Sequence, residues 1–272
     1  MLWYEKGGSG TRAILLLHGL GATSGVWAGV QRVLDERGLG RWFSPDLSGH
    51  GRSDALSQYS VGSLAAELAK LVQGESELFV IGHSLGAYLG LALASRWFGV
   101  DVRGVLAIGP KISWPPADVQ AAHELAMRPV RWYSNSEEAW SRYRRMSGLD
   151  TRVALADEWL RHGVTESAEG WRLSQDSRTF QVAGAPFGSL VSAATSRLLS
   201  GATASPGAGA TASVGSGAKA CLVLARGEHD AMVSTAELQA YCPDTYEIDA
   251  VGHNAHVEKP DEIVRLFGML LK

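Results

Sequence analysis

The chain has 272 residues, of which 46% are hydrophobic and 19% charged, and its formal net charge is −3 at pH 7. This composition is typical of a globular protein with a large buried core, and the slightly acidic balance argues against nucleic acid as a partner. No stretch approaches the roughly 18 uninterrupted apolar residues of a membrane-spanning helix. The N-terminus lacks the pattern of a secretory signal and only two cysteines occur, so we expect a cytoplasmic protein with no membrane partner.

Short apolar runs bounded by Gly, Pro or Asp recur along the chain, at residues 13–19, 41–49, 77–84, 104–110, 221–230 and 245–253. Because the runs are continuous rather than alternating, they predict strands that are buried on both faces, as in a parallel sheet. Segments with helical spacing lie between them, for example at 62–73 and 85–97. The repeated alternation predicts an α/β fold whose ligand chemistry lies at the carboxyl ends of the strands.

The alternation breaks between residues 111 and 199, where we find no convincing strand but several amphipathic stretches, such as 136–146 and 151–163. Five of the nine tryptophans lie here: Trp114, Trp132, Trp140, Trp159 and Trp171. We therefore expect a helical cap at 111–199, inserted into a core formed by 1–110 and 219–272. A separate helical domain is the alternative. Residues 200–218 are rich in Gly, Ala and Ser and predict a flexible surface loop.

The segment GHSLG, at residues 82–86, lies between a predicted strand and a predicted helix. A G-x-S-x-G turn in this context holds its serine in a strained conformation with the hydroxyl above the sheet. Gly82 and Gly86 allow the chain to reverse closely against its neighbours. The helix N-terminus offers N–H groups to a developing anion. Ser84 is therefore the candidate nucleophile.

A serine hydroxyl needs a base to take its proton, and the base needs a third group to orient it. Asp230 follows the apolar run that begins at residue 221, and His253 follows the run that begins at residue 245. Three strand ends would thus deliver Ser84, Asp230 and His253 to one edge of the sheet. The order nucleophile, acid, base along the chain agrees with this architecture.

His253 and His256 are also spaced three residues apart, so a metal site has to be considered. Such a site would need a third ligand, and this spacing suits a helix that has not yet begun at His253. We expect no metal, and we expect His256 to pack or cap locally. His18 is expected to hold the loop after the first apolar run by hydrogen bonds, and His83 to line a pocket or pack.

Five segments together resemble the α/β-hydrolase superfamily, and the resemblance covers nearly the whole chain. They are HGLGATSGVW (18–27), DLSGHGRSD (46–54), GHSLG (82–86), GEHD (227–230) and GHNAHVEKP (252–260). The resemblance implies an α/β-hydrolase fold, with a mostly parallel central sheet flanked by helices and a helical cap insertion. It also implies Ser84 as nucleophile, Asp230 as acid and His253 as base, with the backbone N–H groups of Leu20 and Leu85 as an oxyanion hole.

Some relatives in the superfamily take the acid from the strand end before the cap, but residues 109–111 read GPK and offer no carboxylate there. Glu228 lies near Asp230, and the family spacing favours Asp230. Lys111 and Trp114 follow the same strand end at the root of the cap. They are tentative substrate-binding residues: Lys111 could meet an anionic group or be a solvated stem residue.

These features predict a serine hydrolase that needs no cofactor and cleaves a small, largely apolar ester or related acyl compound through an acyl-enzyme. Cleavage of a C–C bond, a lactone or a thioester on the same triad is the close alternative. A non-catalytic ligand-binding protein on a hydrolase scaffold is the alternative of another class. The expected partner is a small-molecule substrate, and the sequence makes no prediction of oligomeric state.

Overall fold

The computed structural model describes residues 1–149, 157–200, 221–243 and 245–272. In this part of the chain one sheet has the strand order β1-β3-β2-β4-β5-β8-β9. Strand β1 is antiparallel to β3, and all other neighbours are parallel. The strands are β1 (Tyr4–Gly8), β2 (Ala13–Leu17), β3 (Arg41–Pro45), β4 (Leu78–His83), β5 (Val102–Ile108), β8 (Leu222–Gly227) and β9 (Thr245–Ile248). The six predicted runs correspond to β2, β3, β4, β5, β8 and β9, which confirms the predicted α/β architecture.

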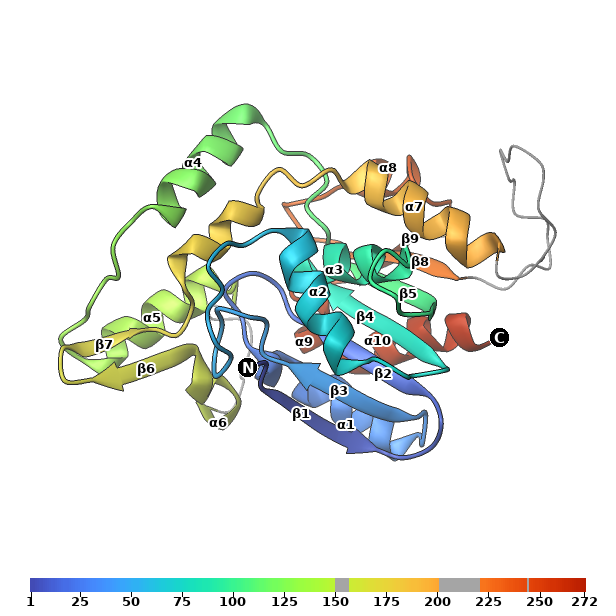
Figure 1. Cartoon of the computed structure of the whole chain (residues 1–272), viewed down its shortest axis with the longest axis horizontal. Helices are drawn as coiled ribbons and strands as arrows, with labels where there is room; N and C mark the ends of the chain where they lie inside the picture. The colour runs from blue at the N-terminus through green and yellow to red at the C-terminus, as the bar shows by residue number, and fades with distance from the viewer. Residues whose placement is uncertain (150–156, 201–220, 244) are drawn as a thin grey trace.

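Both faces of the sheet are covered by helices (Figure 1). Leu15 and Leu17 of β2 pack on one side, and Ile14 and Leu16 pack on the other; all four are fully buried. Burying a leucine or isoleucine in this way stabilises the fold by about 1.5–3 kcal/mol. The first side is covered by α2 (Val61–Leu71), α3 (Leu85–Ala94), α7 (Phe187–Ser200) and α8 (Thr235–Gln239), and the second by η1 (Ser24–Trp27), α1 (Ala28–Glu36), α9 (Ala255–Glu258), α10 (Pro260–Phe267) and η4 (Gly268–Leu271).

The segment between β5 and β8 contains α4 (Pro116–Ala126), α5 (Ser136–Met146), α6 (Asp157–Leu160), η2 (Arg161–Gly163) and η3 (Ser177–Val182) before α7. Figure 1 shows α4 standing clear of the helices that cover the sheet. The helix expected at 136–146 is confirmed as α5. Part of the stretch expected at 151–163 lies outside the described residues, and its remainder forms α6 and η2.

The expectation that 111–199 contains no strand is wrong at one place. Strands β6 (Val164–Ser167) and β7 (Gly170–Leu173) form an antiparallel hairpin. Tyr133 and Trp171 extend the pairing, because each donates its backbone N–H to the carbonyl of the other, at 2.7 and 3.0 Å. Strands of four residues are too short to show a periodic pattern. The position of this hairpin depends instead on its long-range pairing with Tyr133.

The division into core and cap remains a proposal, and α7 bears on where its border lies. Phe187, Leu190, Val191 and Ala194 of α7 are buried in the same cluster as α3. We therefore propose that the cap ends before Phe187 rather than at residue 199. Nearly all of the Gly/Ala/Ser-rich stretch at 200–218 lies outside the described residues.

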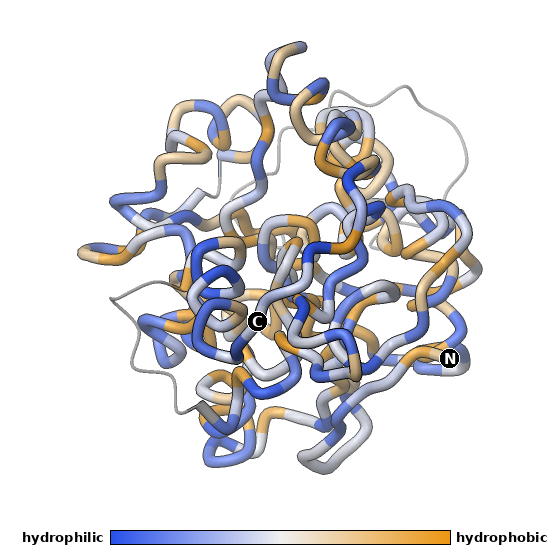
Figure 2. Tube along the Cα trace, turned by 90° about the vertical axis from the view of Figure 1, so that its left-hand side faces the viewer, coloured by the Kyte–Doolittle hydropathy of each residue, from blue (hydrophilic) through white to orange (hydrophobic). Residues whose placement is uncertain are grey.

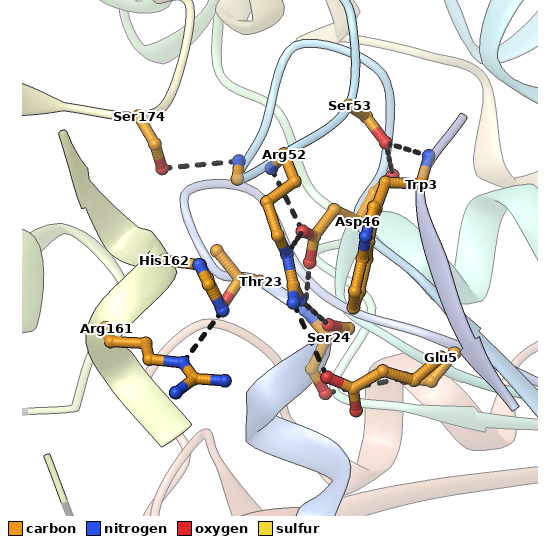
Figure 3. Close-up of polar contacts among 12 residues, drawn as sticks. Trp3, Glu5, Thr23, Ser24, Asp46, Arg52, Ser53, Arg161, His162 and Ser174 are labelled. Carbon is orange, nitrogen blue, oxygen red and sulfur yellow. Dashed lines mark hydrogen bonds and ion pairs between the residues drawn. The ribbon is translucent and has the colours of Figure 1, made fainter. Parts of the chain in front are cut away.

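A partly buried ion pair between Asp46 and Arg52 lies close to the start of the chain and to the segment inserted between β5 and β8 (Figure 3). Asp46 accepts hydrogen bonds from Ser24 N at 2.8 Å and from Arg52 Nε at 2.8 Å, and the Arg52 guanidinium lies over the ring of Trp3. Burial alone would raise the pKa of Asp46, but the hydrogen bonds from Arg52 and Ser24 outweigh it and lower that pKa. From the segment between β5 and β8, the hydroxyl of Ser174 accepts a hydrogen bond from Gly51 N, next to Arg52. This cluster connects the loop that carries Ser24 to the loop that carries Arg52.

Hydrophilic and hydrophobic positions alternate over short stretches of the chain (Figure 2). This pattern is expected of helices and loops that bury one side only. Among the described residues, no helix has both the length and the apolar character needed to cross a membrane.

Candidate active site

Ser84 is the single residue between β4 and α3. Its backbone angles are φ 51° and ψ −112°, a conformation that non-glycine residues rarely adopt. Such strain costs about 1–3 kcal/mol and persists only when the surroundings impose it. Here the N–H of Ser84 donates to the carbonyl of Ile108 on β5 at 2.8 Å, which holds the turn against the neighbouring strand. The structure thus has the sharp strand-to-helix turn that the sequence predicts.

The two glycines of this turn lie where no side chain fits. A Cβ atom on Gly82 would lie 2.2 Å from the carbonyl oxygen of Gly86, and one on Gly86 would lie 2.0 Å from that of Leu17. Both obstacles are backbone atoms, so neither can move without shifting a strand or a helix. Close packing of β2, β4 and α3 therefore requires glycine at both positions.

We expect Gly86→Ala to lower the free energy of unfolding by about 3 kcal/mol, because the added methyl group must displace the backbone of β2. The matched control is Gly268→Ala, since Gly268 has a helical φ of −56° and no neighbouring atom within 4 Å of the added Cβ. Urea unfolding of both variants checks the prediction. Equal stabilities of the two variants would contradict it.

Asp230 and His253 form a hydrogen-bonded pair, with His253 Nδ1 2.9 Å from Asp230 Oδ2. The side chain of Asp230 is fully buried, whereas that of His253 is 21% exposed. The second oxygen of Asp230 accepts a hydrogen bond from Met232 N at 2.8 Å, which fixes the carboxylate. Gly109 lies against the pair: a Cβ there would be 3.0 Å from Asp230 Oδ2 and 3.2 Å from the His253 ring. Gly109, which follows β5, thus leaves room for Asp230, which follows the neighbouring strand β8.

Glu228, the neighbouring acid, has a different partner. Its Oε2 accepts a hydrogen bond from Ala250 N at 2.7 Å. Ala250 has a φ of 54°, so Glu228 stabilises a tight turn after β9. This geometry supports Asp230 rather than Glu228 as the partner of His253.

The loop after β2 lies directly against the elbow. A Cβ on Gly19 would lie 3.1 Å from Ser84 Cβ, and the next residue, Leu20, lines the same cavity as Ser84. Leu85 is the first residue of α3, where a backbone N–H has no acceptor within the helix. Leu20 and Leu85 thus border the same cavity as Ser84, and their role as an oxyanion hole remains a prediction.

Two histidines hold this loop. His18 Nε2 accepts a hydrogen bond from Leu47 N at 2.9 Å, and its Nδ1 donates to Gly19 O at 2.8 Å. His50 Nε2 accepts from Gly21 N at 3.1 Å. The expectation that His18 is structural is confirmed, whereas the sequence analysis did not single out His50. The position of His50, four residues after Asp46 in the DLSGHGRSD segment, could have indicated its role in holding the loop.

Ser84 and His253 line one cavity of about 560 Å³. The wall is mostly apolar, and it is formed by the core loops, α4, the end of α5 and η3. Its apolar side chains include Leu20, Val61, Leu85, Trp114, Leu125, Met146, Phe180, Val182 and Met232. A cavity of this size and character suits a small organic molecule.

Lys111 and Trp114 both line this cavity, but Lys111 already has an anionic partner. Its ammonium group pairs with Asp118 of α4 and lies 4.5 Å from the centroid of the Trp114 ring. Tyr88 OH accepts from Trp114 Nε1 at 3.3 Å and donates to the carbonyl of Lys111. Lys111 therefore connects α4 to the loop that follows β5, and an anionic substrate group would have to compete with Asp118.

The tryptophans of the inserted segment have different environments. Trp114 lines the cavity, Trp140 and Trp171 pack partly buried against the core, and Trp132 and Trp159 are 38% and 41% exposed. The five tryptophans therefore do not form one common core within the inserted segment.

His256 is completely buried and is not among the residues that line the cavity. Its ring packs between those of Trp27 and His83, with centroids 4.5 and 4.3 Å away. Burial, followed by the nearby His253 and His18, lowers the pKa of His256 to about 3. The expectation that it packs locally is confirmed. Within the described ranges, no three His, Cys, Asp or Glu side chains are grouped to hold a metal ion.

Buried neutral histidines make the fold sensitive to acid. Burial lowers the pKa of four of them: His50 and His256 to about 3, and His18 and His83 below the usual 6.5. In the unfolded chain each would bind a proton near pH 6.5, so their stability contribution is present above that pH and lost below it. Because the pKa values of His50 and His256 are about 3, each of these two should remove about 2 kcal/mol between pH 7 and pH 5.

We therefore expect the free energy of unfolding to fall steeply from pH 7 to pH 5, and His256→Phe to reduce that fall by about 2 kcal/mol. Urea unfolding at both pH values measures the slope. His123→Phe, at an exposed position of α4, should leave the slope unchanged. The same slope for both variants would contradict the prediction.

Asn254 is a second residue that the sequence analysis missed. Its Nδ2 donates to the carbonyls of Ser147 and Gly148, at 3.1 and 2.8 Å, just after α5 ends. Ser147 and Gly148 both line the cavity. The residue that follows His253 therefore holds one wall of the cavity in place. The GHN triplet gave no indication of this, because the partners lie more than one hundred residues away.

The sheet, the elbow and the Asp–His pair together define the class of protein, and comparison with known families agrees. The model of the alpha/beta hydrolase family matches residues 14–266. The chain belongs to this family.

Its relatives differ in their assigned activities. The chain is 34% identical over 130 residues to an uncharacterised protein of Mycobacterium tuberculosis (47% of this chain, 36% of the relative). It is 32% identical over 91 residues to lipase LipV of the same organism (33% and 34%), and 25% identical over 132 residues to a putative carbamate hydrolase, RutD, of Escherichia coli (48% of each). The matches thus span about half or less of these curated relatives.

Solved structures agree on the fold over the whole chain. E-2-(acetamidomethylene)succinate hydrolase is similar with a TM-score of 0.72 and 20% identity, covering 100% of this chain and 95% of that one. The thioesterase domain from the curacin biosynthetic pathway is similar with a TM-score of 0.71 and 19% identity, covering 98% and 94%. At these identities the likeness shows the fold alone.

Proposed function

We propose that this α/β hydrolase is a serine hydrolase that cleaves a small, largely apolar ester or related acyl compound without a cofactor. The observation that carries the proposal is that the ends of β4, β8 and β9 bring Ser84, Asp230 and His253 to one edge of the sheet. Ser84 and His253 lie in the wall of one apolar cavity, and Nδ1 of His253 is 2.9 Å from the buried carboxylate of Asp230. A serine, an oriented imidazole and a water-poor pocket are the parts that acyl transfer requires.

In the proposed reaction, His253 takes the proton of Ser84 Oγ as the oxygen attacks the carbonyl carbon. Asp230 stabilises the imidazolium, and the N–H groups of Leu20 and Leu85 donate to the oxyanion. The imidazolium then gives its proton to the leaving alcohol, and the acyl group stays on Ser84. Water attacks this acyl-enzyme with His253 as base, which releases the acid and restores the serine.

The cavity supports a small apolar acyl or alkyl group. About 560 Å³ lies within the range of small-molecule sites, and most of the wall is apolar. Its charged side chains are Lys111, Asp118 and Arg145, of which the first two form an ion pair. A neutral substrate therefore fits this wall better than a highly charged one.

A fluorophosphonate probe and a substrate panel test the proposal. The probe should label Ser84, as peptide mass analysis would show, and Ser84→Ala should abolish the labelling. The panel consists of aryl and alkyl esters of increasing chain length, thioesters, lactones and 1,3-diketones. Turnover of esters with an optimum at short or medium chain length is the expected result. If a thioester, a lactone or a 1,3-diketone were turned over faster, that compound class would replace the ester as the proposed substrate, and the proposed catalytic residues would stay the same.

The alternative of another class is a ligand-binding protein on this scaffold, and the same experiment separates the two. A protein that binds panel compounds without labelling at Ser84 and without turnover would be a binding protein. In that case the Asp230–His253 pair would have a structural role only.

A further inference from the structure

Four aromatic rings form a continuous stack that ends on the proposed base. The ring of Trp27 lies 4.5 Å from that of His256, which lies 4.3 Å from that of His83, which in turn lies 4.5 Å from that of His253. The first three side chains are buried, with at most 3% exposure. They come from η1, α9 and the end of β4, so the stack joins three separate elements behind His253.

Within this ring stack, His83 also makes a directed contact with the base. Its Nε2 lies 2.9 Å from the backbone carbonyl oxygen of His253. A carbonyl oxygen can only accept, so Nε2 carries the hydrogen and His83 Nδ1 carries none. Nδ1 has no hydrogen-bond partner among the described residues. It faces the loop after β2, since a Cβ on Gly19 would lie 2.9 Å from it.

The backbone of His253 needs such a contact. His253 lies in the connection between β9, which ends at Ile248, and α9, which begins at Ala255, so no strand ladder or helix holds it. Asp230 fixes one edge of its ring through Nδ1. His83 reaches its carbonyl from the residue that precedes the nucleophile, and so connects nucleophile and base directly.

The charge state of His83 suits this contact. Burial lowers the pKa of His83 well below 6.5, and the neighbouring His256 and His253 lower it further. His83 therefore stays neutral and keeps its single hydrogen on Nε2. No carboxylate contacts the ring of His83 or His256 among the hydrogen bonds and ion pairs of the described residues.

We propose that His83 is a positioning residue for His253, that its Nε2–H···O=C hydrogen bond sets the distance from the base to Ser84 Oγ, and that His256 and Trp27 hold the His83 ring in place. The inference rests on the proposed function. It adds a role for two histidines outside the proposed triad: His83, which lines the cavity beside Ser84, and His256, which is not among its lining residues. A misplacement of about 1 Å at a catalytic group can cost about 10²-fold in rate.

The test compares two substitutions at His83. Phenylalanine preserves an aromatic ring in the stack but removes the donor, whereas the side-chain amide of glutamine can place an N–H near the position of Nε2. The exposed His123→Phe is the control for an unrelated histidine of α4. The measured quantities are the rate constant of Ser84 labelling by the fluorophosphonate, per labelled site, and kcat and KM for the best ester.

We expect His83→Phe to lower both the labelling rate constant and kcat by about 10²-fold, with KM changed by less than about threefold. His83→Gln should recover at least about tenfold of that loss, because it restores a donor. His123→Phe should match the wild type. Normalising to labelled sites removes any effect of a smaller folded fraction.

Three outcomes would overturn the inference. One is a labelling rate per site for His83→Phe that equals the wild-type rate. It would show that His83 has a packing role only. A second is an equal loss for Phe and Gln, which would show that the donor is irrelevant. The third is absence of labelling in the wild type, which would overturn the proposed function itself and the inference with it; the first two leave the proposed function intact.

Discussion

Ser84→Ala is expected to lower kcat/KM for the best ester by at least about 10⁴-fold, because removal of a catalytic serine leaves only the stabilisation of the oxyanion and substrate binding. The fold should survive, since the hydroxyl of Ser84 is not the group that holds the elbow. The turn is held by the Ser84 N–H donated to Ile108 and by the two glycines around it. The measurements are steady-state kinetics and thermal unfolding of the purified variant.

Ser189→Ala is a matched control, because Ser189 is an exposed serine of α7 outside the cavity wall. It should keep wild-type kcat/KM. Ser84→Ala that retains ester turnover at a rate near the wild type would show that another group makes the acyl-enzyme, or that none forms. Loss of activity together with loss of the folded state would require repeating the measurement with Ser84→Cys.

His253→Ala should lower kcat/KM by about 10⁵-fold, since the serine then lacks a base and the leaving group lacks an acid. Because the two residues act as a unit, combining His253→Ala with Ser84→Ala should lower the rate little further. The double variant is therefore as informative as the single ones. Additive losses would indicate that Ser84 and His253 act in separate steps.

His256→Ala is the comparison that the sequence itself suggests, as it removes the other histidine of the same segment. Its ring is fully buried between Trp27 and His83, so the variant should lose about 3 kcal/mol of unfolding free energy through the cavity left behind. Its loss of kcat/KM should be about tenfold, since it acts on the base only through His83. If His256→Ala lost more activity than His253→Ala, the base would be wrongly assigned.

Local signals were sufficient for much of the site. Continuous apolar runs predicted the six strands because a strand buried on both faces has no polar face to interrupt it. The turn at Ser84 could be predicted because the two glycines and the serine that form it lie within five consecutive residues. Asp230 and His253 could be predicted because each lies in the loop that follows a strand, and parallel strands bring their carboxyl ends to one edge.

The sequence could not predict contacts whose two halves lie far apart in the chain. The bridge between Tyr133 and Trp171, which fixes the β6–β7 hairpin, and the bonds from Asn254 to the residues after α5 belong to this group. So does the position of α7, which packs on α3 although it follows the inserted segment. In each case the partner is chosen by three-dimensional packing, which leaves no periodic trace in a single stretch of residues.

The segment from Gly252 to Pro260 shows both sides of this division. The sequence alone determined that one of its histidines follows a strand and can meet the acid from the strand beside it. Only the tertiary structure decided what the other does, because burial between Trp27 and His83 depends on η1, β4 and α9 meeting behind the base. Chain order fixes which residues reach the edge of the sheet, and packing fixes which rings support them there.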